Sequence, residues 1–243
     1  MLPNQAKKRM VMIGIKYYGK TYNIMTKYIL HGGQTKIDCE SNTQFFREFL
    51  NLQKNEITIL LCYFARAGEE WTKLEEQDKE KISDINCHSC AGRNLEKGIG
   101  FPGHSDACPR MTLKKKITFI LASKDKFLNQ LVKSDVLYLR GGDGHIIRDV
   151  LSKYDDLGSL FQNKIMAGSS AGANVLAKYY YDQDTGRIEE GLGILPVKTI
   201  CHYGDGNMYG RSFEKELADL TDLEGNLETI VLKETQFVVR EIE

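Results

Sequence analysis

The sequence predicts an α/β fold, a three-layer sandwich in which a mostly parallel central sheet is flanked by helices. Continuous apolar runs such as "ITILLCYF" (57–64), "ITFIL" (117–121) and "VLYL" (136–139) have the composition of strands buried on both faces. These runs alternate with amphipathic or charged segments of helical length, and glycine clusters follow several of them. Such alternation is typical of a parallel sheet that is covered by helices on both sides.

The expected elements follow in order along the chain. A short strand at 28–30 ends in "HGG", and Ser41 and Asn42 then offer caps for an amphipathic helix that carries phenylalanines on one side. The remaining elements are, in order, a strand at 57–64, a charged helix from 68 to 82, strands at 117–121 and 136–139 separated by a helix at 124–132, a helix that "RGGDG" opens and that runs through 150–151, a strand at 165–167, a helix at 171–178, a helix at 213–220, and two short strands near Ile230 and Val238.

Two segments fall outside this alternation. Residues 1–24 do not fit the pattern, and we interpret them as a disordered N-terminal extension without an assigned function, or as sequence that precedes a true start at Met25. Residues 25–243 are expected to form a single domain. A Cys- and His-containing segment at about 86–112 interrupts a helix-to-strand connection, and we interpret it as an inserted loop.

Composition excludes several classes of protein. The 33 basic and 33 acidic residues balance, whereas a nucleic-acid-binding protein normally shows a basic excess or stripe. No apolar run approaches the roughly 18 residues that span a bilayer, and the apolar stretch at 10–15 is too short for a secretory signal. Six cysteines are too sparse for a disulfide scaffold. We therefore expect a cytoplasmic protein, monomeric or homodimeric, with neither nucleic acid nor membrane as a partner.

Four small-residue motifs follow the predicted strands. In parallel sheets, functional groups gather at the carboxyl ends of the strands. This rule places "HGG" (31–33), "RGGDG" (140–144), "GSSAG" (168–172) and "CHYGDG" (201–206) along one edge of the sheet. The convergence of these motifs is the strongest functional signal in the sequence.

The motif "GSSAG" matches the pattern G-x-S-x-G, with Ser170 at the serine position. A sharp strand-to-helix turn tolerates only small flanking residues and exposes one hydroxyl group at the start of the helix. Backbone N–H groups and the helix dipole at that point stabilise developing negative charge. Taken alone, the motif fits a serine-capped turn as well as it fits a nucleophile.

A nucleophilic serine needs a base and an acid that orients the base. His202 is the best placed of the five histidines, because it follows an apolar run that ends at the same edge; His31 is a second candidate. An orienting acid is expected between Ser170 and His202, where we favour Asp184 and Asp182 over the two glutamates of that stretch. Spacing does not choose between the two aspartates.

Glycines at the end of the 136–139 strand supply the remaining part. The backbone N–H groups of Gly141 and Gly142, together with that of Ala171, are placed to form an oxyanion hole. A phosphate-binding role for these glycines is weaker, because neither G-x-x-x-x-G-K-[ST] nor G-x-G-x-x-G is present.

Three blocks, "LRGGDGHIIRDVL", "AGSSAGANVLA" and "GLGILPVKTICHY", resemble the diagnostic blocks of the dipeptidase E (aspartyl dipeptidase) family of serine peptidases. The resemblance runs from about residue 26 to the end of the chain. It implies a class I glutamine amidotransferase-like fold, Ser170 as nucleophile, His202 as general base, and an acid in the loop after the nucleophile helix, which again points to Asp182 and Asp184.

The resemblance also implies a substrate. Known members cleave dipeptides with an N-terminal aspartate, so a short peptide is the expected partner. An acidic side chain in the substrate would need a cation, and Arg211 lies where the family places one. A solvated arginine at a helix start explains Arg211 equally well.

The inserted segment contains Cys87-x2-Cys90 and His104-x3-Cys108. Paired sulfur and imidazole ligands are what a structural zinc site requires, although the second spacing is not a standard one. We favour a plain loop over a zinc-stapled one, and we expect no cofactor, because a serine site needs no metal.

The leading hypothesis is thus a serine peptidase that acts on short peptides. An α/β-hydrolase esterase would normally carry its histidine much farther from the serine, and a glutamine amidotransferase would carry cysteine in place of Ser170. The alternative from a different class is a non-catalytic protein that keeps the fold and binds a peptide or a metabolite.

Overall fold

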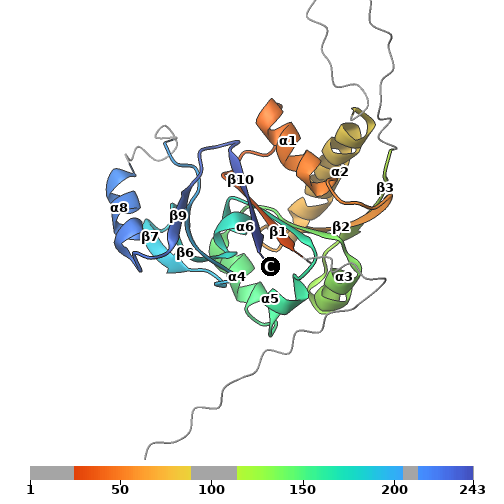
Figure 1. Ribbon diagram of the computed structural model, residues 1–243. Helices are drawn as coiled ribbons and strands as arrows, with labels where there is room; N and C mark the ends of the chain where they lie inside the picture. Colours follow the sequence, from red (N-terminus) through yellow and green to blue (C-terminus); the bar gives the residue numbers. More distant parts are fainter. Residues whose placement is uncertain (1–24, 89–113, 205–212, 243) are drawn as a thin grey trace, which may run out of the picture.

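The computed structural model describes residues 25–88, 114–204 and 213–242. These residues form two sheets with helices packed around them (Figure 1). None of the helices in the described ranges combines the length and the apolar character that crossing a membrane requires.

The main sheet has six strands, five of them parallel. In order across the sheet, these are β10 (Phe237–Ile242), β1 (Thr26–His31), β5 (Ile165–Ser169), β4 (Val136–Leu139), β2 (Glu56–Cys62) and β3 (Lys116–Leu121). Only β10 runs antiparallel, against β1. The parallel strands β1, β4 and β5 therefore end at one edge, and the "HGG", "RGG" and "GSSAG" motifs follow them there, as the sequence predicts.

Two helices cover one face of the main sheet, α1 (Glu40–Phe49) and α2 (Trp71–His88). Phe45, Phe46 and Phe49 of α1 are fully buried against apolar residues of the sheet. The predicted aromatic face of this helix is therefore its core face.

The opposite face is covered by four short helices and by the second sheet. The helices are α3 (Phe127–Lys133), α4 (Gly144–Leu151), α5 (Leu157–Leu160) and α6 (Ala171–Asn174). Two 3₁₀ turns, η1 (Gly68–Glu70) and η2 (Lys124–Lys126), precede α2 and α3. The side chain of Asp143 caps α4 by accepting hydrogen bonds from the backbone N–H groups of His145 (2.8 Å) and Ile146 (3.0 Å).

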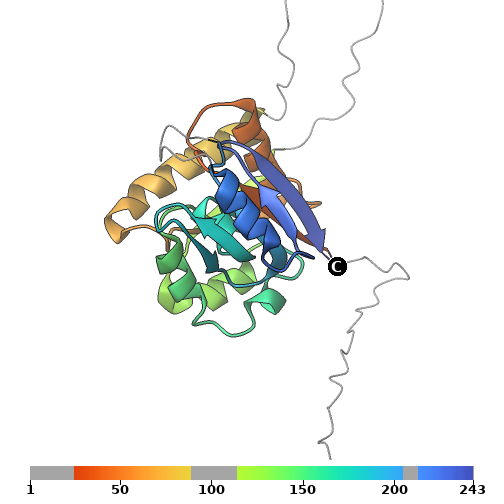
Figure 2. The ribbon, with the colours of Figure 1, turned by 90° about the vertical axis from the view of Figure 1, so that its left-hand side faces the viewer.

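The second sheet has the strand order β7 (Arg187–Glu190), β6 (Ala177–Asp182), β8 (Leu195–Ile200) and β9 (Glu228–Val231). Leu195, Val197 and Ile230 on its inner face join the core under the main sheet. Its outer face is covered by α8 (Glu214–Asp222), which lies in front of the strands in Figure 2. The prediction that His202 follows a strand of the main sheet is therefore wrong, because its strand, β8, belongs to the second sheet.

Two element boundaries also differ from the prediction. The helix after Ser170 ends at Asn174 instead of 178, since the tyrosine-rich run at 179–181 favours a strand and pairs with β7 and β8. The helix α2 extends to His88, past the expected start of the inserted segment. Asn86 exchanges hydrogen bonds with the backbone of Lys115 (2.8 and 3.2 Å), which joins the two chain ends that border residues 89–113.

Candidate active site

Ser170 lies at a sharp turn between β5 and α6. Its backbone has φ 52° and ψ −118°, a conformation that non-glycine residues rarely adopt. The flanking glycines are required by close packing: a Cβ on Gly168 would lie 2.3 Å from the carbonyl oxygen of Gly172, and one on Gly172 would lie 2.0 Å from that of Leu139. The small residues of "GSSAG" thus allow a turn that exposes the Ser170 side chain.

The Ser170 hydroxyl group faces a histidine. Ser170 Oγ lies 2.8 Å from His202 Nε2, so the structure brings these two predicted residues together. Because α6 is only one turn long, the helix dipole contributes less at this point than the sequence suggested, and individual N–H groups matter more.

A carboxylate contacts the other nitrogen of the histidine, and it belongs to Glu234. The distance from His202 Nδ1 to Glu234 Oε1 is 3.2 Å, and both side chains are about one-fifth exposed (18% and 21%). The expectation that Asp182 or Asp184 occupies this position is wrong in the structure. Ser170, His202 and Glu234 form a chain of hydrogen bonds with the connectivity of a catalytic triad.

The two aspartates lie elsewhere in the same cavity. Asp182 Oδ2 is 3.0 Å from His145 Nε2 at the start of α4, and Asp182 Oδ1 accepts a hydrogen bond from the backbone N–H of Asp184 (3.0 Å). They lie at the end of β6, which turns into β7. Because β8 lies between β6 and β9 in the second sheet, the aspartates follow the strand on one side of β8, and Glu234 follows the strand on the other side.

The sequence argument places the acid between the serine and the histidine, whereas Glu234 lies beyond both. It follows β9, which pairs in parallel with β8, so the segments beyond Ile200 and Val231 leave the sheet side by side. The backbone N–H of Tyr203 donates to Leu232 (3.0 Å) and continues this pairing. A carboxylate shortly after a predicted strand was the signal in the sequence that could have found it.

The glycines after β4 lie beside the serine. A Cβ on Gly141 would be 2.8 Å from Ser170 Cβ and 3.4 Å from Ser170 Oγ. Within the described ranges, no residue accepts a hydrogen bond from the backbone N–H of Gly141, Gly142 or Ala171. These donors are therefore available to a bound group at the place that the sequence predicts for the oxyanion hole.

The serine opens into a cavity of about 610 Å³ with a largely polar lining. Its charged lining residues within the described ranges are Lys36, Arg66, Glu70, Lys73, Arg140, Asp182 and Asp184. Arg66 Nε donates a hydrogen bond to the carbonyl oxygen of Gly141 (2.7 Å), which places a guanidinium group directly beside Gly141 and Gly142.

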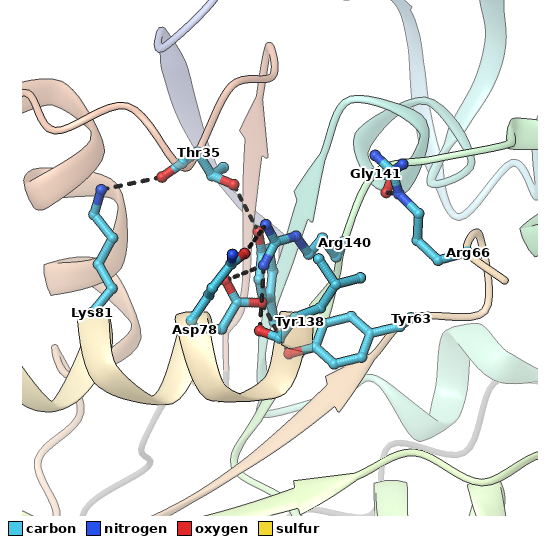
Figure 3. A network of polar contacts seen from close by, with 10 residues as sticks. Thr35, Tyr63, Arg66, Asp78, Lys81, Tyr138, Arg140 and Gly141 are labelled. Carbon is cyan, nitrogen blue, oxygen red and sulfur yellow. Dashed lines mark hydrogen bonds and ion pairs between the residues drawn. The ribbon is translucent and has the colours of Figure 1, made fainter. Parts of the chain in front are cut away.

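A buried polar network supports the wall of this cavity (Figure 3). Arg140 pairs with Asp78 of α2 (2.6 Å), and the hydroxyl group of Tyr63 donates to the same carboxylate (2.9 Å). Burial raises the pKa of Asp78, and the pairing with Arg140 opposes this effect. The Arg140 charge is therefore neutralised internally and is less available to a ligand than that of Arg66.

A neighbouring thiol is not an alternative nucleophile. Cys201 directly precedes His202, but it is buried, and burial raises the pKa of its thiol group to about 12. Because the thiolate is the reactive form, this cysteine is inert at neutral pH.

Several predicted residues lie outside the described ranges. They are Arg211, Cys90, His104 and Cys108. Cys87 is exposed near the end of α2 with a free thiol. Within the residues that the structure describes, no group of three or more His, Cys, Asp or Glu side chains is arranged to hold a metal ion. The zinc-stapled loop and the role of Arg211 stay predictions.

Fold and site together define an α/β hydrolytic enzyme with a serine at a strand-to-helix turn. The family model for Peptidase family S51 matches residues 114–242, which include Ser170, His202 and Glu234. The chain belongs to this family. It is a serine-type peptidase, as the three sequence blocks indicate.

A solved structure of low sequence identity shares the fold, and a second one is reported beside it. A peptidase from an acI-B1 Actinobacterium is 17% identical with a TM-score of 0.59, over 89% of this chain and 84% of that one. A putative peptidase E protein from Listeria monocytogenes EGD-e is 14% identical with a TM-score of 0.48, over 90% of this chain and 100% of that one. No curated protein matches the sequence.

Proposed function

We propose that the protein hydrolyses short peptides through an acyl-enzyme formed on Ser170. The observation that carries the proposal is the chain of contacts from Ser170 Oγ to His202 (2.8 Å) and on to Glu234 (3.2 Å). His202 Nε2 accepts the hydroxyl proton as Oγ attacks the scissile carbonyl carbon, and then donates it to the departing amine. Water, deprotonated by the same nitrogen, hydrolyses the ester and restores Ser170.

Glu234 orients the base in this proposal. Its carboxylate accepts a hydrogen bond from Nδ1–H of His202, which leaves the lone pair of Nε2 facing the serine. The same carboxylate stabilises the imidazolium that forms during the attack.

The oxyanion of the tetrahedral intermediate would accept hydrogen bonds from the backbone N–H groups of Ala171, Gly141 and Gly142. The closeness of Gly141 to Ser170 and the availability of these donors support this role.

We further propose that the substrate carries an acidic residue, in line with an N-terminal aspartate. Support comes from Arg66, whose guanidinium group is held beside Gly141 and remains 42% exposed, and from Lys36 and Lys73 in the same cavity. A bidentate arginine contact is well suited to a carboxylate. Arg211 is a second candidate for this contact. A cytoplasmic site of action and a monomeric or homodimeric state remain part of the proposal.

The test combines labelling with hydrolysis. A fluorophosphonate should modify Ser170, located by peptide mass spectrometry, and Ser170→Ala should abolish both the labelling and the hydrolysis of an Asp-X dipeptide panel. Asn-X dipeptides, which differ only in the charge of the side chain, should be cleaved more slowly. If wild type is neither labelled nor active, the protein is the non-catalytic binder instead. If Asn-X and Asp-X are cleaved equally, the acidic preference is wrong.

A further inference from the structure

The "HGG" segment at the end of β1 forms backbone hydrogen bonds with Ser170, with His202 and with the residue that follows Glu234. The carbonyl oxygen of His31 accepts from the N–H of Ser170 (2.8 Å), and that of Gly32 accepts from the N–H of His202 (3.2 Å). The carbonyl oxygen of Gly33 accepts from the N–H of Thr235 (3.0 Å), the residue next to Glu234. Three consecutive peptide groups therefore set the backbone positions of three residues that are distant in sequence.

Gly33 also packs directly on the imidazole ring. It adopts φ +127°, which favours glycine, and a Cβ at this position would lie 2.1 Å from Cε1 of His202. The backbone of Gly33 thus packs against one side of the His202 imidazole ring and leaves no room there for a side chain.

The conformation of this segment is held by the side chain of His31. His31 is completely buried; its Nδ1 accepts a hydrogen bond from the N–H of Gly33 (3.0 Å), and its Nε2 lies 2.8 Å from Asn42 Oδ1. Because Nδ1 is an acceptor, the proton of the neutral ring is on Nε2. Burial lowers the pKa of His31 to about 4, so the ring is neutral at pH 7.

Asn42 selects this tautomer. Its amide nitrogen donates to the carbonyl oxygens of Gln34 (2.9 Å) and Ile37 (2.7 Å), so its oxygen is the atom that faces His31. The ammonium group of Lys81 donates to the carbonyl oxygens of Thr35 (3.2 Å) and Ile37 (3.0 Å) from α2, as Figure 3 shows for Thr35. The charged and titratable groups near His31 are His202 and Lys81, and both oppose its protonation.

We propose that His31 and Asn42 are positioning residues for the reaction: they set the geometry of the 31–33 segment and, through it, the approach of His202 to Ser170. This inference rests on the proposed function. His31 does not touch Ser170 Oγ in the structure, so it acts through the backbone and not as the second-candidate base that the sequence suggested.

Loss of either side chain has a definite physical consequence. Without His31, the buried N–H of Gly33 has no acceptor, and the segment must move to satisfy it. Without the Asn42 oxygen, the ring can carry its proton on Nδ1 instead. Two hydrogen-bond donors, Nδ1–H of His31 and N–H of Gly33, would then face and repel each other. A displacement of about 1 Å in a catalytic group costs on the order of 100-fold in rate.

The experiment compares four variants as folded proteins. His31→Leu and Asn42→Leu remove the side-chain hydrogen bonds that hold the 31–33 segment. His31→Asn is the conservative variant, since its amide oxygen can replace Nδ1 as the acceptor for the N–H of Gly33. Phe49→Leu is the matched control, because Phe49 is buried on the same helix as Asn42 and its ring packs on those of Phe45, Phe46 and Tyr138 instead of the ring of His31. Ser170 labelling by a fluorophosphonate and kcat/KM are measured across pH, per mole of folded protein.

We expect His31→Leu and Asn42→Leu to lower labelling and kcat about 10- to 100-fold with little change in KM. We expect His31→Asn to recover most of the loss, and Phe49→Leu to lower stability alone. Equal rates per folded molecule in all variants would overturn the proposal.

A second readout does not depend on catalysis. Long-range ¹H–¹⁵N NMR of the imidazole rings should show His31 protonated only at Nε2 between pH 5 and 8, and His31→Leu should shift the ring signals of His202. If wild-type Ser170 is not labelled but the His202 signals respond, the proposed function fails and the positioning survives. Unchanged His202 signals, or a His31 ring protonated at Nδ1, would contradict the positioning itself.

Discussion

Ser170 and His202 both adopt positive φ, 52° and 54°, although neither is glycine. Strained backbone of this kind costs about 1–3 kcal/mol per residue and persists where the surrounding structure enforces it. Here the enforcement comes from the hydrogen bonds to the carbonyl groups of His31 and Gly32. In this backbone conformation the side chains of Ser170 and His202 face each other.

At the scale of single residues, the acid is the sharpest point to test. Glu234→Gln keeps the size of the side chain but removes the charge that stabilises the imidazolium and selects its tautomer. We expect kcat to fall by about 10³- to 10⁴-fold with little change in folding stability. Steady-state kinetics on a cleaved dipeptide would measure it.

The controls for this prediction are other carboxylates. Glu228 is an exposed glutamate of β9 that pairs with Arg240 of β10, and Glu228→Gln should leave kcat unchanged. Asp182→Asn and Asp184→Asn should cost less than Glu234→Gln. A larger loss for Asp184→Asn would return the orienting role to the loop in which the sequence placed it.

At the scale of elements, the turn between β5 and α6 depends on glycine for packing. A methyl group on Gly172 would collide with the backbone of β4, because its Cβ would lie 2.0 Å from the carbonyl oxygen of Leu139. We expect Gly172→Ala to lower the free energy of unfolding by about 2–3 kcal/mol and to reduce labelling of Ser170, since the turn must shift. Urea denaturation followed by circular dichroism measures the first effect.

Gly158→Ala is the matched control. Gly158 lies in α5, and a Cβ there meets no atom within 4 Å. The same substitution should therefore be neutral or stabilise the protein by up to about 1 kcal/mol. If both variants lost the same stability, packing at the turn would not be the cause.

At the scale of the whole molecule, the Arg140–Asp78 pair joins α2 to the end of β4 beneath the cavity. The side chains are 11% and 5% exposed, so removing one charge leaves the other buried without a counterion. We expect Asp78→Asn to lower the free energy of unfolding by about 3 kcal/mol or more. Urea denaturation of wild type and variant at neutral pH measures this loss.

The contrasting pair lies on the surface. Glu56 and Lys116 are 73% and 72% exposed, and Glu56→Gln should change the free energy of unfolding by less than about 0.5 kcal/mol. A loss for Asp78→Asn as small as this would mean that the buried pair is incidental to the fold.

Local patterns in the sequence predict the strands of the main sheet and the two residues, Ser170 and His202, that meet at its edge. Apolar runs and glycine motifs are local signals, because burial on both faces and a close turn each restrict the residue type at the position itself. Ser170 and His202 could be found because their motifs follow recognisable strands.

The tertiary structure is needed to tell which sheet carries His202, which carboxylate contacts it, and which groups His31 and Asn42 contact. The alternation of strands and helices does not show that β6–β9 form a separate sheet, because the composition of a strand does not tell which strand it pairs with. Glu234 is 32 residues beyond His202 in sequence and reaches it because β8 and β9 pair in parallel. Such contacts depend on strand pairing across long sequence separations, which no local pattern encodes.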